Sequence, residues 1–133
     1  MDKEKKKFLR SILFRHLDGI ALCCPISALN KNGVTRFIQS DPSFSIQDIL
    51  NNFECNSGYL NVTLRLLASQ DWLTYNIIED GFNIQYTLTP KGEKCMTLAH
   101  HYNQFAEHFN QLVHIDNILF DMHSNPGQKE LNI

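Results

Sequence analysis

The sequence lacks the cysteine pattern of a disulfide-bonded protein, the long apolar run of a membrane protein and the leader of a secreted protein. Its four cysteines, Cys23, Cys24, Cys55 and Cys95, form no CxxC pair and no compact disulfide pattern. We interpret them as reduced thiols that are mostly packed in a core. No uninterrupted apolar run approaches the ~18 residues of a membrane span, and the basic start "MDKEKKKFLR" leads into a charged amphipathic segment instead of a signal peptide. These features predict a cytoplasmic protein with no membrane partner.

The chain also lacks an excess of basic residues. Its formal net charge is -2, whereas phosphate neutralisation gives most nucleic-acid-binding domains a clear positive charge. Hydrophobic residues make up 43% and charged residues 20% of the 133 positions, which is ordinary for a globular protein. The length fits one domain. The sequence therefore predicts a single globular domain that does not work mainly on nucleic acid.

The first third of the chain has the pattern of helices. Residues 4–18 carry apolar side chains on one face and most basic side chains on the other. Gly19 interrupts this pattern, and residues 20–33 continue as a second helical segment that Pro25 must kink or restart. Gly33 can supply a left-handed cap at its end. The apolar set of the first helix is Phe8, Leu9, Ile12, Leu13, Leu17 and Ile20.

The middle of the chain predicts a helix-turn-helix. After a short helix over "VTRFIQS", Ser45 and Asp48 form the start signal of a compact helix, "SIQDILNNF". Asn56 can then cap an amphipathic helix over residues 58–73, "GYLNVTLRLLASQDWL". Two helices joined by a short polar turn form this motif.

A hairpin follows the helix-turn-helix. The segments "LTYNII" and "FNIQYTL" are rich in β-branched and aromatic residues, and "EDG" separates them. Thr89 and Pro90 then begin a new helical region, which we expect to continue to about Met122 as one long helix or two shorter ones. The predicted fold is mainly α: a winged helix with a two-stranded β wing and flanking N- and C-terminal helices. Its domain spans residues 1–122, and residues 123–133 form a tail or linker.

The stretch "YLNVTLRLLASQDWL", followed by "YTLTPKGE", resembles the N-terminal domain of S-adenosylmethionine-dependent O-methyltransferases of the small-molecule and polyketide-pathway type. The family pattern is a helix with "LRLL", a small residue, a "G-W/F-L" turn, a hairpin and "LTPxG". The resemblance covers about residues 8–98. Asp71 stands where the family usually has glycine, which puts the shape of the turn into the wing in doubt.

The resemblance implies a function that this chain alone cannot perform. In that family the domain is a winged helix that dimerises and covers the substrate cleft of a following Rossmann-type catalytic domain, which binds S-adenosylmethionine. This sequence has no glycine-rich loop of the kind that binds such a cofactor. We therefore expect a non-catalytic homodimerisation and substrate-lid domain that holds no cofactor itself, as a fragment or a stand-alone relative of such a methyltransferase.

Two other functions share the predicted fold. One is a winged-helix transcriptional regulator, but the helix after Asn56 offers Arg65 as its only cation, and the wing tip carries Glu79 and Asp80. Nucleic-acid recognition needs basic and amide side chains at these places, so this function is disfavoured. The other is a docking or adaptor domain of a large synthase. This function implies the same fold as the methyltransferase domain, and the two differ only in the protein to which the domain is attached.

The histidines and cysteines predict neither a metal site nor a catalytic site. His101 and His108 are two helical turns apart, about 10 Å, too far to share one zinc ion. Cys23 and Cys24 have no identifiable base partner.

The candidate site is therefore a surface. We predict that the apolar set from Phe8 to Ile20 forms the dimer interface. The alternative is that it packs within one chain against the aromatic face between Phe105 and Phe120. The predicted core of the winged helix is Leu60, Leu64, Leu67, Trp72 and Leu88.

Overall fold

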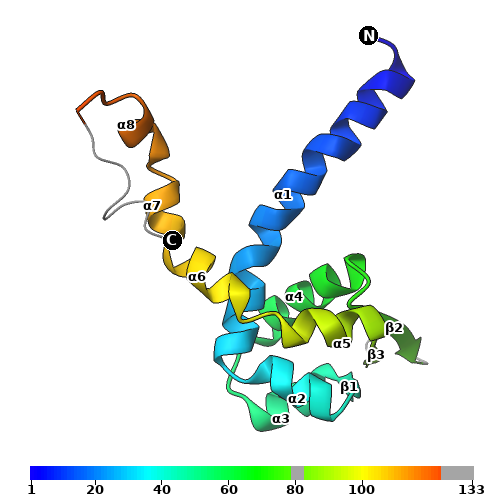
Figure 1. Cartoon of the computed structure of the whole chain (residues 1–133). Coiled ribbons are helices and arrows are strands. Elements are labelled where there is room, and N and C mark those ends of the chain that lie inside the picture. Colours follow the sequence, from blue (N-terminus) through cyan, green and yellow to red (C-terminus); the bar gives the residue numbers. More distant parts are fainter. Residues whose placement is uncertain (79–82, 124–133) are drawn as a thin grey trace.

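The computed structural model describes residues 1–78 and 83–123 of the chain (Figure 1). It begins with α1, a single helix over Lys3–Lys31 that the Asp2 side chain caps. The predicted interruption at Gly19 is wrong, and Pro25 lies inside the helix. Glycine costs a helix about 1 kcal/mol, and proline withholds one backbone N–H. The helix continues through both because Ile26 and Leu29 beyond them are anchored in the core.

Judged on length and composition alone, α1 is long and apolar enough to cross a membrane. Only 17% of its most apolar 18-residue stretch is buried. The expectation from the sequence concerned uninterrupted apolar runs, whereas an average over such a stretch also tolerates charged residues. Core helices and N-terminal signal sequences have the same property, so it is weak support for a membrane role.

The helix-turn-helix forms as predicted, with one additional strand. The order is α2 (Val34–Ser40), β1 (Ser43–Ser45), α3 (Ile46–Asn52) and α4 (Ser57–Ser69). Gly33 precedes α2 in the left-handed region, with φ 86°. The predicted caps are present: Ser45 and Asp48 form a reciprocal capping box on α3, and the Asn56 side chain accepts from the Tyr59 N–H.

The two-stranded wing forms as predicted, and a third strand extends its sheet. β2 (Leu73–Ile78) and β3 (Asn83–Leu88) form the antiparallel hairpin, and β1 pairs with the other edge of β3, giving the order β1-β3-β2. The segment that joins β2 to β3, including Glu79 and Asp80, lies outside the described residues. The sequence of elements from α2 to β3 is that of a winged helix.

One apolar core holds these elements together. Phe44 of β1 stacks on Tyr86 of β3, with ring centroids 5.8 Å apart. The buried residues include Ile26, Leu29, Val34, Ile38, Phe44, Ile49, Leu60, Leu64, Leu67, Trp72, Leu73, Ile84, Tyr86, Met96 and Ala99. Four of the five predicted core residues belong to this cluster, and Leu88 is half-buried against it.

A close approach fixes the start of α5 (Pro90–Thr97) against the turn between α4 and β2. The Thr89 side chain accepts from the Gly92 N–H at 2.8 Å and donates to the Asp71 carbonyl at 2.6 Å. A Cβ at Gly92 would collide with the carbonyl oxygen of Trp72. The "LTPKG" segment therefore has a physical reason: threonine caps the helix, proline begins it, and glycine lets it touch the turn before the wing.

The C-terminal region differs from the prediction of one or two long helices. After α5 come three short helices, α6 (His101–Glu107), α7 (Phe109–Leu112) and α8 (Ile115–Leu119). Tight turns separate them, with i to i-3 hydrogen bonds such as His114 N–H to the Gln111 carbonyl at 3.1 Å. Among the described residues of α6 to α8 none is buried. Such short helices are marginal without packing, so nothing enforces one straight axis.

α1 and α6 pack together close to the winged helix. Beyond this contact two arms diverge: the N-terminal arm is the first part of α1, before Leu22, and the C-terminal arm runs from α6 to Met122 (Figure 1). A chain of side-chain hydrogen bonds crosses the contact. The Ser27 hydroxyl donates to Asn103, Asn103 donates to Asn30 and Asn30 donates to Thr35, at 2.8, 3.0 and 3.2 Å. Because Ser27 and Thr35 are buried, these bonds satisfy polar groups that would otherwise destabilise the fold.

Candidate functional site

The predicted interface residues all lie on the free part of α1. Residues 1–21 are exposed, and this part of the helix extends away from the winged helix (Figure 1). The six candidate residues are exposed by 39% to 64%: Phe8, Leu9, Ile12, Leu13, Leu17 and Ile20. Phe14, which the sequence analysis left out, is 51% exposed. We call the six candidates together the α1 face.

The alternative that the α1 face packs within one chain does not agree with the structure. Its six members stay exposed, and so do Phe105, Leu119 and Phe120 on the C-terminal arm. The contact between α1 and α6 instead involves the part of α1 around Cys23 and Ser27. Both arms of the described chain therefore present apolar side chains to solvent.

A second apolar surface lies on α4 and β2. Tyr59 and Val62 of α4 are exposed by 77% and 55%, at the end of the helix where a DNA-reading winged helix needs hydrogen-bonding side chains. On β2, Tyr75 and Ile77 are also exposed. Both elements therefore present large apolar side chains to solvent.

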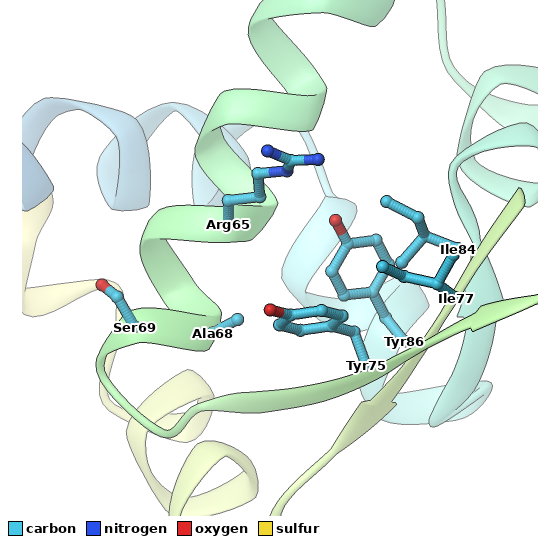
Figure 2. Close-up of a pocket in the computed structure, with 7 residues that line it drawn as sticks. All are labelled: Arg65, Ala68, Ser69, Tyr75, Ile77, Ile84 and Tyr86. Carbon is cyan, nitrogen blue, oxygen red and sulfur yellow. The ribbon is translucent and has the colours of Figure 1, made fainter. Parts of the chain in front are cut away.

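Between α4 and the wing is a cavity of about 490 Å³ (Figure 2). The strand register forms its floor, since Tyr75 pairs with Tyr86 and Ile77 pairs with Ile84, and paired residues share one face of a sheet. α4 forms the opposite wall. The lining residues are Arg65, Ala68, Ser69, Tyr75, Ile77, Ile84 and Tyr86. We call this cavity the α4–wing pocket.

One polar atom of the pocket is unsatisfied. Tyr86 is fully buried, and its hydroxyl has no hydrogen-bond partner. Burial raises the pKa of this tyrosine above its ordinary value, and nearby Arg65 partly offsets that increase through its positive charge and through a side-chain contact with the hydroxyl that falls short of hydrogen-bond geometry. Figure 2 shows Tyr75 and Tyr86 directed from the sheet towards α4, with the Arg65 side chain on the same side. The pocket thus combines an apolar floor, a cation and a free hydroxyl.

The histidines and cysteines do not gather into a site. Across residues 1–78 and 83–123, no group of three or more potential ligands is placed to hold a metal ion. All four cysteines are free thiols. Cys23 is buried, which raises the pKa of its thiol, but Cys24 and Cys55 are exposed, so the prediction that most are packed is wrong for these two. Cys24 follows Cys23 on the same helix and therefore points away from the core.

The comparisons with known proteins give one family and several distantly similar structures, two of which are described here. The family described as "AprA N-terminal domain" matches residues 9–75, just over half of the chain. No curated protein matches the sequence. Solved structures of reduced AbfR and of overoxidized AbfR, each bound to DNA, share 15% identity and a TM-score of 0.45 with this chain. They cover 91% and 90% of it and are themselves covered completely. At this level of similarity they carry no argument about what the chain binds.

The sequence analysis predicted the α1 face but missed the α4–wing pocket. Arg65 and Tyr86 are 21 positions apart, and only the strand register and the position of α4 bring them together. The one available signal was alternation: Ile84 and Tyr86 in β3, with Tyr75 and Ile77 in β2, lie at every second position. That pattern predicts a shared face, but it cannot show that part of the face stays open.

Proposed function

Because the chain belongs to the AprA N-terminal domain family, we propose that it is a non-catalytic winged-helix interaction domain that forms a homodimer through the α1 face. We further propose that it accompanies a small-molecule methyltransferase domain that uses S-adenosylmethionine, and that it covers the substrate cleft of that domain. The observation that carries the first part is the exposed α1 face. The family name, which designates an N-terminal domain, supports a role beside further domains.

The α1 face has the size and chemistry of a helical interface. The free part of α1, from Lys3 to Ala21, is about 28 Å long at ~1.5 Å per residue. Burying apolar surface stabilises an association by roughly 25 cal/mol per Å², and six large side chains are available on one broad side of this helix. In a two-fold symmetric dimer the same face contacts its own copy. A second copy of the chain is therefore the partner that we propose.

The charges on α1 are compatible with self-association. At 100° per residue, Lys5 and Lys6 fall within the sector of the six apolar residues, at its N-terminal end before Phe8. Arg10 and Arg15 lie about 20° outside its two edges. All four cations can therefore remain solvated, at the end or the edges of the interface, while two apolar faces meet.

Two observations support the methyltransferase partner. The first is the resemblance of residues 59–92 to the N-terminal domains of O-methyltransferases, from the "LRLL" helix to "LTPKG". The second is the apolar surface around Tyr59 and Val62, since a helix that contacts a following domain needs no cations there. A DNA-binding regulator has less support, because the exposed half of α4 offers Arg65 as its one cation.

Molecular mass in solution tests the dimer. Sedimentation equilibrium of the chain is expected to give twice 15.4 kDa. The double substitution Leu13→Glu and Leu17→Glu places charges in the interface and is expected to give a monomer with an unchanged circular dichroism spectrum. The matched control is Val62→Glu, at an equally exposed apolar position on α4, which should remain a dimer. A monomeric wild-type chain, or loss of the dimer only in the control, would contradict the proposal.

The methyltransferase partner needs a separate test. An antibody to this domain can isolate the native protein from its source for intact mass measurement. A mass well above 15.4 kDa, with transfer of methyl groups from S-adenosylmethionine by the isolated protein, is the expected result. A native mass of 15.4 kDa without copurifying methyltransferase activity would contradict this part and leave the dimer proposal intact.

A further inference from the structure

We propose that the α4–wing pocket binds a small monocarboxylic acid with a compact apolar body. Arg65 would pair with the carboxylate, the Tyr86 hydroxyl would donate to it, and the sheet would receive the hydrocarbon or aromatic part. This inference does not depend on the proposed dimer or on the methyltransferase partner, because the pocket and the α1 face share no residue.

The first observation is the shape of the site. A volume of about 490 Å³ lies within the range of small-molecule sites, about 300–1,000 Å³. The floor is a continuous apolar and aromatic surface, since Tyr75 and Tyr86 lie with their centroids 6.2 Å apart beside Ile77 and Ile84. A flat or short-chain apolar body fits such a floor.

The second observation concerns the two polar groups of the site, the Tyr86 hydroxyl and the Arg65 guanidinium. A buried hydroxyl without a hydrogen-bond partner costs a folded protein about 1–3 kcal/mol, and the Tyr86 hydroxyl has no partner that meets hydrogen-bond geometry, although Arg65 lies beside it. In the part of the chain that the structure describes, no carboxylate forms an ion pair with Arg65. A hydroxyl and a guanidinium that lie beside each other at one end of an apolar pocket, with no carboxylate among the described residues paired to the guanidinium, match a group that is both an acceptor and an anion.

The third observation concerns the charge of the ligand. Among the described residues that line the pocket, Arg65 is the only charged one, and the pocket does not lie at the N-terminal end of α4, where backbone N–H groups could add to the field. One cation balances one negative charge. A monocarboxylate therefore fits better than a phosphate, whose higher charge and additional oxygens would remain uncompensated.

The test is a titration of the full chain, labelled with nitrogen-15, with benzoate and with hexanoate. Two-dimensional amide spectra are expected to show saturable shifts at Arg65, Ala68 and Ile84. Benzamide and hexanamide have the same shape without the charge, and they should bind about ten-fold more weakly.

Two variants and one control identify the residues responsible. Arg65→Gln should weaken carboxylate binding by about ten-fold, because a charge-assisted pair is lost. Tyr86→Phe should weaken it by about five-fold, although it removes an unsatisfied group and should make the free chain more resistant to heat. If the hydroxyl had only a structural role, its removal would not weaken ligand binding while also raising the thermal stability of the free chain. The control Arg36→Gln, an exposed arginine on α2, should bind both acids like the wild type.

Several outcomes would overturn the proposal. They are an absence of saturable shifts at the pocket with either acid at millimolar concentration, equal affinity for the acids and the amides, or the same loss in Arg36→Gln as in Arg65→Gln. The sedimentation result is independent of all three, because Arg65 and Tyr86 lie outside α1. Failure of this proposal is therefore distinguishable from failure of the proposed function.

Discussion

At the scale of single residues, the turn between α4 and the wing shows most clearly how this sequence specifies its fold. Asp71 adopts a left-handed conformation, with φ 64°, where the resembling family usually has glycine. Aspartate tolerates that conformation better than most residues. The turn therefore keeps the shape that a glycine would give, and Thr89 fastens it by donating to the Asp71 carbonyl.

Gly92→Ala is predicted to destabilise the chain by about 2–3 kcal/mol, because the new methyl group collides with backbone atoms of Trp72 that cannot move freely. Urea unfolding followed by circular dichroism measures the change. The matched control is Gly19→Ala, in the middle of α1 with open space around it, which should instead stabilise the chain by up to about 1 kcal/mol. Equal effects of the two substitutions would contradict the close approach.

Tyr86→Phe is predicted to stabilise the free chain by about 1 kcal/mol, because it removes a buried hydroxyl without a partner. The folded chain also raises the pKa of Tyr86, mainly by burial. Ionisation then begins earlier in the unfolded state, so the wild type should lose stability as pH rises above about 10. That loss should be smaller in Tyr86→Phe and unchanged in Tyr59→Phe, at an exposed position. Thermal unfolding between neutral and alkaline pH measures both effects.

At the scale of elements, features that depend on neighbouring residues, such as helix caps, could be predicted from the sequence. Features that depend on contacts between distant segments could not. The caps at Ser45, Asn56 and Thr89 were predicted because each depends on residues within three positions. β1 was missed because three residues make a strand only when β3, about 40 positions away, pairs with them. The C-terminal helices were mispredicted because their apolar spacing was helical, but no core holds them straight.

One polar residue, His16, lies among the members of the α1 face and would be buried with them in a dimer interface. His16 is four residues from both Ile12 and Ile20, so it lies on the same side of the helix as these residues. Burying leucine instead of a polar ring stabilises a helix contact. His16→Leu is therefore predicted to tighten the dimer by about ten-fold, whereas His114→Leu on the C-terminal arm should leave its dissociation constant unchanged. Sedimentation velocity at several concentrations measures this, and weaker association of His16→Leu would count against the interface.

At the scale of the whole molecule, the chain combines a packed winged helix with two arms that leave apolar side chains in solvent (Figure 1). The winged helix itself was predictable from alternating patterns and caps. The exposure of the arms was not, because apolar spacing on α1 is the same whether the helix packs within one chain or against another. Only the positions of α1 and α6 show that the apolar side chains from Phe8 to Ile20 remain exposed in the described part of the chain.

The most direct test of the proposed dimer is to observe which side chains meet. A sample that mixes carbon-13-labelled and unlabelled chains, refolded together, reports only contacts between two copies when the nuclear Overhauser effects are isotope-filtered. We predict intermolecular contacts among Ile12, Leu13, Leu17 and Ile20. An absence of intermolecular contacts, or contacts confined to Val62 and Ile77 on the winged helix, would contradict dimerisation through the α1 face.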